Sequence, residues 1–132
     1  MRLVVDTNIL FSFFKEVSLT RSLILNPTLH LISPEKSLTE LNKYSDEISK
    51  KAKNDNFRKV LGDLEKVVIF IPKKEYSSYI SNAEKFSPDL GDSDFFALCL
   101  KEGCPLWSND SILRRQDQIK ILSTKDIIDI LI

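Results

Sequence analysis

The chain has 132 residues, of which 42% are hydrophobic and 29% charged, with only three glycines and five prolines. This composition is typical of an ordered globular protein, so we expect one domain that buries a core without disulfides or a structural metal. Nineteen basic residues balance nineteen acidic ones, which excludes a global positive field for non-specific nucleic-acid binding. Local basic clusters remain, either as phosphate contacts or as solvated helix faces: residues 50–53, 58–59, 73–74 and 114–115.

Membrane segments and histidine chemistry find no support in the sequence. The longest apolar stretch, "VVIFIP" at 67–72, is too short to cross a bilayer, and a charge interrupts the opening residues before a signal peptide could form, so we expect a cytoplasmic protein. Cys99 and Cys104 lack the partners of a zinc site and are expected to be buried free thiols. His30, the single histidine, cannot build a Ser-His-Asp arrangement alone. Chemistry must come from carboxylates, hydroxyls or lysines.

Strand-forming runs alternate with helical stripes along the chain. The strands are expected at residues 2–6, 29–33, 67–71, 105–108 and 119–123. The helices are expected at residues 7–16, 18–26, 37–52, 57–64, 76–86, 92–102, 110–115 and 124–132. This alternation predicts an α/β fold, a three-layer α/β/α sandwich around a central, mostly parallel sheet of about five strands.

Acidic residues occupy the predicted carboxyl edge of this sheet. Asp6 ends the first strand and Asp110 follows the fourth, so parallel strands would bring both to the same edge. Asp92 begins the helix that precedes the fourth strand, and Glu40 lies in the first turn of the helix after the second strand. Asp94 is the weaker candidate, because two residues turn a helix by about 200°. We therefore expect four carboxylates from separate segments to converge.

Such a convergence calls for a cation. Two carboxylates about 4 Å apart repel one another by about 4 kcal/mol at an effective dielectric constant near 20. Oxygen ligands without cysteine or histidine suit Mg²⁺ or Mn²⁺, which can lower the pKa of water and stabilise the leaving oxygen in phosphodiester cleavage. The sequence therefore predicts a divalent-metal site.

Each acidic residue also has a purely structural interpretation. The segment "SLTE" at 37–40 matches a capping box, in which Glu40 would reach back to the amide of Ser37. Asp92 and Asp110 could be helix N-caps favoured by the helix dipole. These interpretations account for the residues singly, but they do not explain why all lie at one predicted edge.

Three segments together resemble the PIN domain, the metal-dependent ribonuclease fold found in the toxin halves of bacterial and archaeal toxin–antitoxin pairs. They are "VVDTNIL" at the start, "LTELNKY" in the predicted helix after the second strand, and "DSDFFALCLKEGCPLWSND", and they occur in the order of that family. The resemblance implies that residues 1–132 form a single PIN-like nuclease domain.

The same resemblance implies roles for individual residues. Asp6, Asp92 and Asp110 would hold one or two Mg²⁺ or Mn²⁺ ions, and Glu40 would orient or deprotonate the attacking water. Asp92 is favoured over Asp94 because it lies eleven residues before Gly103, the family spacing. Asn8, Ser108 and Asn109 would contact either the metal ligands or the substrate. The resemblance further implies a homodimer, an antitoxin that inserts near the site, and contact of residues 50–59 with RNA or a partner.

Three functions compete. The first is a Mg²⁺/Mn²⁺-dependent endoribonuclease, in which a metal-activated water attacks the phosphodiester directly. The second is a PIN-fold binding or assembly module with a weak or inactive metal site, which the neutral net charge keeps open. The third, an aspartyl-phosphate protein, is less favoured because only Asp6 follows the first strand and the phosphatase pattern D-x-D-x-T is missing. The RNA or DNA that is cut cannot be read from these residues.

Overall fold

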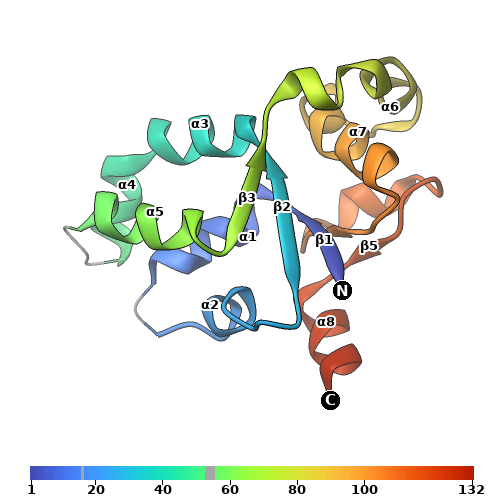
Figure 1. Ribbon diagram of the computed structural model, residues 1–132. Coiled ribbons are helices and arrows are strands. Elements are labelled where there is room, and N and C mark those ends of the chain that lie inside the picture. The colour runs from blue at the N-terminus through green and yellow to red at the C-terminus, as the bar shows by residue number, and fades with distance from the viewer. Residues whose placement is uncertain (16, 53–55) are drawn as a thin grey trace.

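The computed structural model describes residues 1–15, 17–52 and 56–132 and contains a five-stranded, wholly parallel sheet with helices on both faces (Figure 1). The strand order is β3-β2-β1-β4-β5. The strands are β1 (Arg2–Val5), β2 (His30–Pro34), β3 (Val68–Ile71), β4 (Leu106–Trp107) and β5 (Ile121–Leu122). The predicted three-layer α/β/α fold with a five-stranded parallel sheet is confirmed.

Two hydrophobic cores, one on each face of the sheet, follow from the alternation of side chains along the strands. In β1, Leu3 and Val5 join the first core and Val4 joins the second. The first core includes side chains of α1 (Thr7–Phe11), α2 (Leu19–Ile24), α3 (Glu35–Lys43), α4 (Ser45–Ala52), α5 (Phe57–Glu65) and α8 (Thr124–Leu131). The second includes side chains of α6 (Ile80–Phe86) and α7 (Ser93–Glu102). Every residue of β1 after Arg2 is therefore buried, as a central parallel strand requires.

Short 3-10 helices join several of these elements. They are η1 (Ser12–Phe14), η2 (Lys73–Glu75), η3 (Ser77–Tyr79), η4 (Leu90–Asp92) and η5 (Ser111–Arg115). Two of them lie directly next to predicted acidic residues, since Asp92 is the last residue of η4 and Asp110 is the N-cap of η5.

The strand order reverses between β1 and β4. From β1 the chain adds β2 and then β3 on one side, and it returns to place β4 and β5 on the other. Val5 pairs with Trp107, and the backbone N–H of Asp6 donates to the carbonyl oxygen of Trp107 at 3.0 Å. The residues that follow β1 and β4 therefore meet at the topological switch point, where open α/β sheets bind their ligands.

The predicted helix beginning at Ser37 is wrong at its start and in its length. Pro34 is the extended N-cap of α3, with φ −63° and ψ 148°, so the helix begins at Glu35. The helix ends at Lys43, and the C-cap residue Tyr44, with φ −105° and ψ 22°, separates α3 from α4. Glu40 consequently lies in the second turn of α3 and not in the first.

Two other predicted helices are shorter than expected. The helix expected at 76–86 begins at Ile80, because η2 and η3 occupy the preceding residues. The helix expected at 7–16 ends at Phe11 and continues as η1, and its last residue lies outside the described residues. The break expected at 53–55 also lies outside them.

Both cysteines are free thiols as predicted, but only Cys99 is buried as expected. Within the described part of the chain both cysteines are free; Cys99 is buried and Cys104 is half-buried. Burial raises the pKa of the Cys99 thiol, as expected for an inert core residue. Among residues 1–15, 17–52 and 56–132, no helix has the length and apolar character needed to cross a membrane.

Candidate active site

Asp6 is delivered to the carboxyl edge by the buried strand β1 and is only 8% exposed. It occupies the N-cap position of α1, but within the described residues its carboxylate makes no capping hydrogen bond. The Ser108 hydroxyl donates to Asp6 Oδ2 at 2.8 Å instead. The carboxylate is therefore held toward β4 and is not used to start the helix.

Burial is the largest influence on the protonation of Asp6. It raises the pKa of the carboxyl, and the negative charge of Glu40 raises it further. The Ser108 hydroxyl opposes this rise, as do the nearby backbone N–H groups of Asn8 and Thr7, which approach the carboxylate without the geometry of a capping bond. Asp6 and Glu40 are therefore close enough for the charge of Glu40 to affect the ionisation of Asp6.

Asp92 lies at the junction of η4 and α7, and its carboxylate also makes no capping hydrogen bond within the described part of the chain. Burial raises the pKa of this half-buried group to about 6, with further contributions from the charges of Asp6, Asp89 and Asp110. Lys36 opposes the rise. Asp92 is thus the N-cap residue of α7 by position, but its carboxylate does not cap the helix and lies in the field of two other predicted site residues.

Asp110 lies in the loop between β4 and η5 and is exposed. Its backbone N–H donates to Ser108 Oγ at 3.1 Å, and its Oδ1 accepts the backbone N–H of Ile112 at 3.0 Å. The capping interpretation holds for one oxygen of this carboxylate. The Ser108 hydroxyl connects the backbone of Asp110 to the carboxylate of Asp6.

Asn109 supports the same loop from the other side. Its Oδ1 accepts the backbone N–H of Thr124 at 2.8 Å, and its Nδ2 donates to Thr124 Oγ1 at 3.1 Å. The indole N–H of Trp107 donates to that same hydroxyl at 3.1 Å. Asn109 thus holds the loop against the start of α8, and both polar atoms of its amide are hydrogen-bonded. This arrangement positions the neighbouring Asp110.

Two buried serines, Ser33 and Ser37, lie where β2 leads into α3, the helix that carries Glu40. Ser33 Oγ lies 2.8 Å from both the carbonyl oxygen of Val5 and Ser37 Oγ, and Ser37 Oγ lies 2.7 Å from the carbonyl oxygen of Pro34. These contacts join the ends of β1 and β2 to the first turn of α3. Because Ser37 lies inside the helix, the predicted capping box is wrong. The available signal in the sequence was Ser33, a serine that directly follows the buried apolar residues Leu31 and Ile32 of β2.

Asp94 is turned to a different part of the molecule. The Tyr76 hydroxyl donates to Asp94 Oδ2 at 2.6 Å, and burial together with this carboxylate raises the pKa of Tyr76. Asp94 lines a separate cavity with Glu35 and Tyr76. Lys36, also on this cavity, donates to the carbonyl oxygen of Gly91 and influences Asp92. Lys36 was not predicted as a site residue, because nothing in its spacing connects it with the acidic residues.

The donor chemistry at the edge fits Mg²⁺ or Mn²⁺, although the side chains do not form a closed ligand set. Among the described residues, no three His, Cys, Asp or Glu side chains lie close enough together to hold a metal ion as they stand. The carboxylates nevertheless influence one another: Glu40 acts on Asp6, and both Asp6 and Asp110 act on Asp92. A cation would relieve this repulsion, and oxygen donors are those that Mg²⁺ and Mn²⁺ prefer.

The fold and this edge define a class of protein. Residues 4–124 match the family model described as PIN domain. The match covers most of the 132 residues and includes Asp6, Glu40, Asp92 and Asp110. The chain therefore belongs to the PIN domain family, whose members are generally nucleases. A search of curated proteins found no match.

Proposed function

We propose that this protein is a Mg²⁺- or Mn²⁺-dependent endoribonuclease that hydrolyses RNA phosphodiester bonds. The observation that carries the proposal is the junction of two acidic segments at the switch point, where the Ser108 hydroxyl donates to Asp6 Oδ2 at 2.8 Å and accepts the backbone N–H of Asp110 at 3.1 Å. The pKa of Asp92, raised to about 6 in part by the charges of Asp6 and Asp110, supports it. Carboxylates from three separate segments act on one another at the switch point of a PIN fold, and such mutual repulsion is typical of a site built for a cation. RNA as the substrate follows from the resemblance to ribonucleases of this family.

The acidic residues take different roles in this proposal. Asp6, Asp92 and Asp110 bind the ion. Ser108 orients the Asp6 carboxylate through its 2.8 Å hydrogen bond, and Asn109 fixes the Asp110 loop through Thr124. Outer contacts of this kind fix ligand orientation in metal sites. Asn8 is exposed beside the edge and contacts the substrate.

Glu40 takes the part of the general base. It acts electrostatically on Asp6 but belongs to a separate helix, α3, so it can face the attacking water across the site. Its carboxylate accepts a proton from this water, which then attacks phosphorus, and the bond to the leaving ribose oxygen breaks. A bound Mg²⁺ or Mn²⁺ would neutralise charge on the phosphate oxygens and lower the pKa of water.

Cleavage assays test the proposal directly. Wild-type protein, Asp6→Asn and Asp92→Asn should be incubated with structured and unstructured RNA in Mn²⁺, with and without a chelator. We expect wild-type cleavage that both substitutions and the chelator abolish, whereas the exposed Asp129→Asn control cleaves as wild type does. Equal cleavage by all four proteins would show that a contaminant cuts the RNA and would refute the assignment.

A second candidate is a PIN-fold binding or assembly module with a weak or inactive metal site. It is favoured by the lack of a closed ligand set among the described residues and by the neutral net charge. Thermal unfolding in Mn²⁺ separates the two candidates, because a ligand that binds only the folded state raises the melting temperature by mass action. An unchanged melting temperature at millimolar Mn²⁺ would favour the module.

The toxin role is the finer part of the proposal. It rests on the resemblance to the PIN domain, the fold found in toxin halves of toxin–antitoxin pairs, and it carries with it a homodimer and a dedicated antitoxin. A single nuclease domain over residues 1–132 is proposed for either role. A small reading frame for an antitoxin beside the gene would support this role, and its product should then suppress cleavage when co-expressed. A gene with no such neighbour would favour a housekeeping nuclease.

A further inference from the structure

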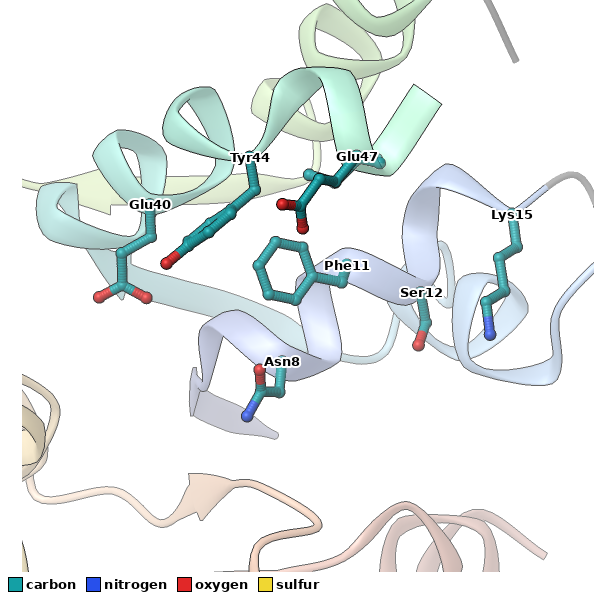
Figure 2. A pocket seen from close by; sticks show the side chains of 8 residues that line it. Asn8, Phe11, Ser12, Lys15, Glu40, Tyr44 and Glu47 are labelled. Atoms are coloured by element: carbon teal, nitrogen blue, oxygen red, sulfur yellow. The ribbon is translucent and has the colours of Figure 1, made fainter. Parts of the chain in front are cut away.

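A cavity of about 560 Å³ opens beside the acidic edge, between the α1–η1 segment and the α3–α4 segment. Figure 2 shows its side chains converging from both segments, with Glu40 and Asn8 at one end and Lys15 at the other. Its lining consists of Asn8, Phe11, Ser12, Lys15, Glu40, Tyr44, Glu47 and Ile48. The volume falls within the range of about 300–1,000 Å³ found for small-ligand pockets. Because Glu40 belongs to both, the cavity and the acidic edge are continuous.

An aromatic pair, half-buried Phe11 and exposed Tyr44, forms the wall of this cavity. The rings of Phe11 and Tyr44 meet edge to face, with centroids 6.4 Å apart and an interplanar angle of 80°. Tyr44 is 39% exposed, and Lys43 Nζ lies 5.5 Å from the centre of its ring. The break between α3 and α4 at Tyr44 turns its hydroxyl end toward Glu40 (Figure 2). The pair thus presents an accessible aromatic surface next to the predicted general base.

We propose that this cavity receives one unstacked base of the RNA strand, next to the phosphodiester held at the acidic edge. The inference rests on the proposed nuclease function and requires an unpaired stretch of the RNA, because a base within a duplex is not free to leave the stack. Exposed aromatic rings bind single-stranded nucleic acid by stacking on successive bases. A base on Tyr44 would place its own phosphate toward Glu40, where the cavity joins the edge.

The polar groups around the rings suit a base. The carboxylate of Glu47 points to the Phe11 ring, and Asn8 lines the cavity on the other side of Phe11 (Figure 2). A carboxylate accepts hydrogen bonds from the N–H groups of a base edge, and an amide can both donate and accept. Lys15, at the far end, is a cation for the next phosphate of the strand. The lining therefore provides an aromatic ring on which a base can stack, polar groups for the edge of that base and one cation for the RNA backbone.

Binding of single-stranded RNA that carries 2-aminopurine at successive positions tests this proposal. Fluorescence of the 2-aminopurine is followed in Ca²⁺ and in chelator to measure binding. Cleavage of the same RNA is measured separately in Mn²⁺. Tyr79 supplies the matched control, because it is 36% exposed and lies in η3, outside the cavity lining. We expect quenching at one position with wild type, Tyr79→Ala and Tyr44→Phe, and at least roughly tenfold weaker binding with Tyr44→Ala. In the cleavage assay, Tyr44→Ala should also raise the KM for RNA, with a smaller change in kcat.

The outcomes separate this proposal from the proposed function. Tyr44-dependent quenching without cleavage in Mn²⁺ would support the base pocket and refute the nuclease. Cleavage by wild type with equal binding and KM for folded Tyr44→Ala would refute the pocket alone. Lack of quenching at every position with wild type would also overturn it, and would be the result if the cavity held a protein segment instead. Circular dichroism of each variant confirms that the comparison is between folded proteins.

Discussion

The Ser108 hydroxyl donates a hydrogen bond of 2.8 Å to Oδ2 of Asp6 and so joins two residues that lie 102 positions apart in the sequence. Both residues are buried, at 1% and 8% exposure. The bond exists because β1 and β4 are parallel neighbours whose ends coincide, with Val5 opposite Trp107. It fixes the direction of the central acidic side chain before any ligand arrives.

Replacing Ser108 should weaken metal binding without unfolding the protein. Ser108→Ala removes a donor that opposes the raised pKa of Asp6, so the carboxyl becomes harder to ionise and less well oriented. Loss of such an outer contact lowers metal affinity by roughly 10- to 100-fold. Titration of Mn²⁺ followed by calorimetry measures the change, and Ser108→Thr, which keeps the hydroxyl, should retain most of the affinity. Equal affinity for Ser108→Ala and wild type would contradict this role.

The protonation of Asp92 predicts how stability depends on pH. Its pKa is raised to about 6 from a model-compound value of 3.8, so the folded state holds this proton more tightly than the unfolded state does. Below about pH 4 both states are protonated and the group costs nothing; as pH rises through about 6, the folded state must carry an unfavourable charge. In chelator, Asp92→Asn should therefore melt above wild type near pH 7, and the difference should vanish near pH 4.

Metal reverses this ranking. Mn²⁺ should raise the melting temperature of wild type near neutral pH, because ionised Asp92 then gains a partner, and should raise that of Asp92→Asn much less. Asp129→Asn, an exposed carboxylate on α8, serves as the control and should follow wild type throughout. A lower melting temperature for Asp92→Asn than for wild type in chelator at neutral pH would mean that Asp92 stabilises the fold, which contradicts its assignment.

Glu40 should affect turnover more than metal binding. As the proton acceptor for the attacking water, its loss in Glu40→Gln should lower kcat by roughly 10²- to 10⁴-fold, while the Kd for Mn²⁺ changes little. Steady-state cleavage and Mn²⁺ titration of the same preparation separate the two effects. Glu84→Gln, an exposed glutamate on α6, should leave both unchanged. A large rise in Kd with unchanged kcat at saturating metal would make Glu40 a ligand instead.

Two glycines should respond with opposite signs to alanine. Gly103 ends α7 with φ of +63°, and a Cβ there would meet no atom within 4 Å, so the cost of Gly103→Ala is that of the left-handed backbone alone, about 1–2 kcal/mol. Gly62 lies within α5, and a Cβ there also meets nothing within 4 Å, so Gly62→Ala should stabilise the protein by about 0.5–1 kcal/mol. Urea unfolding measures both. Equal changes would show that the cap geometry is unimportant.

The sequence predicted the features that depend on periodicity and on strand direction. Buried runs such as Leu3 to Val5 identified the central strand, and the parallel sheet that followed from strand–helix alternation was enough to expect Asp6 and Asp110 at one edge. Gly103 marked the end of α7, since a left-handed residue there is nearly always glycine. These are local or simple topological rules.

Features set by contacts between distant segments escaped prediction. The start of α3 depends on the extended backbone of Pro34 and on Ser33 and Ser37, whose partners include Val5. The different positions of Asp92 and Asp94 depend on Tyr76, whose hydroxyl donates a hydrogen bond to Asp94. No spacing within one segment reports such partners, because they are brought together only by the tertiary fold.

The origin of the oxygen in the cleaved phosphate tests the central claim most directly. Wild-type protein should cleave single-stranded RNA in Mn²⁺ and ¹⁸O-labelled water, and mass spectrometry of the fragments should be compared with that for Asp6→Asn. Direct attack by water at the acidic edge predicts terminal phosphate monoesters with one ¹⁸O atom from wild type and intact RNA from the variant. Fragments ending in an unlabelled 2′,3′-cyclic phosphate, or the same labelled fragments from Asp6→Asn, would contradict the account.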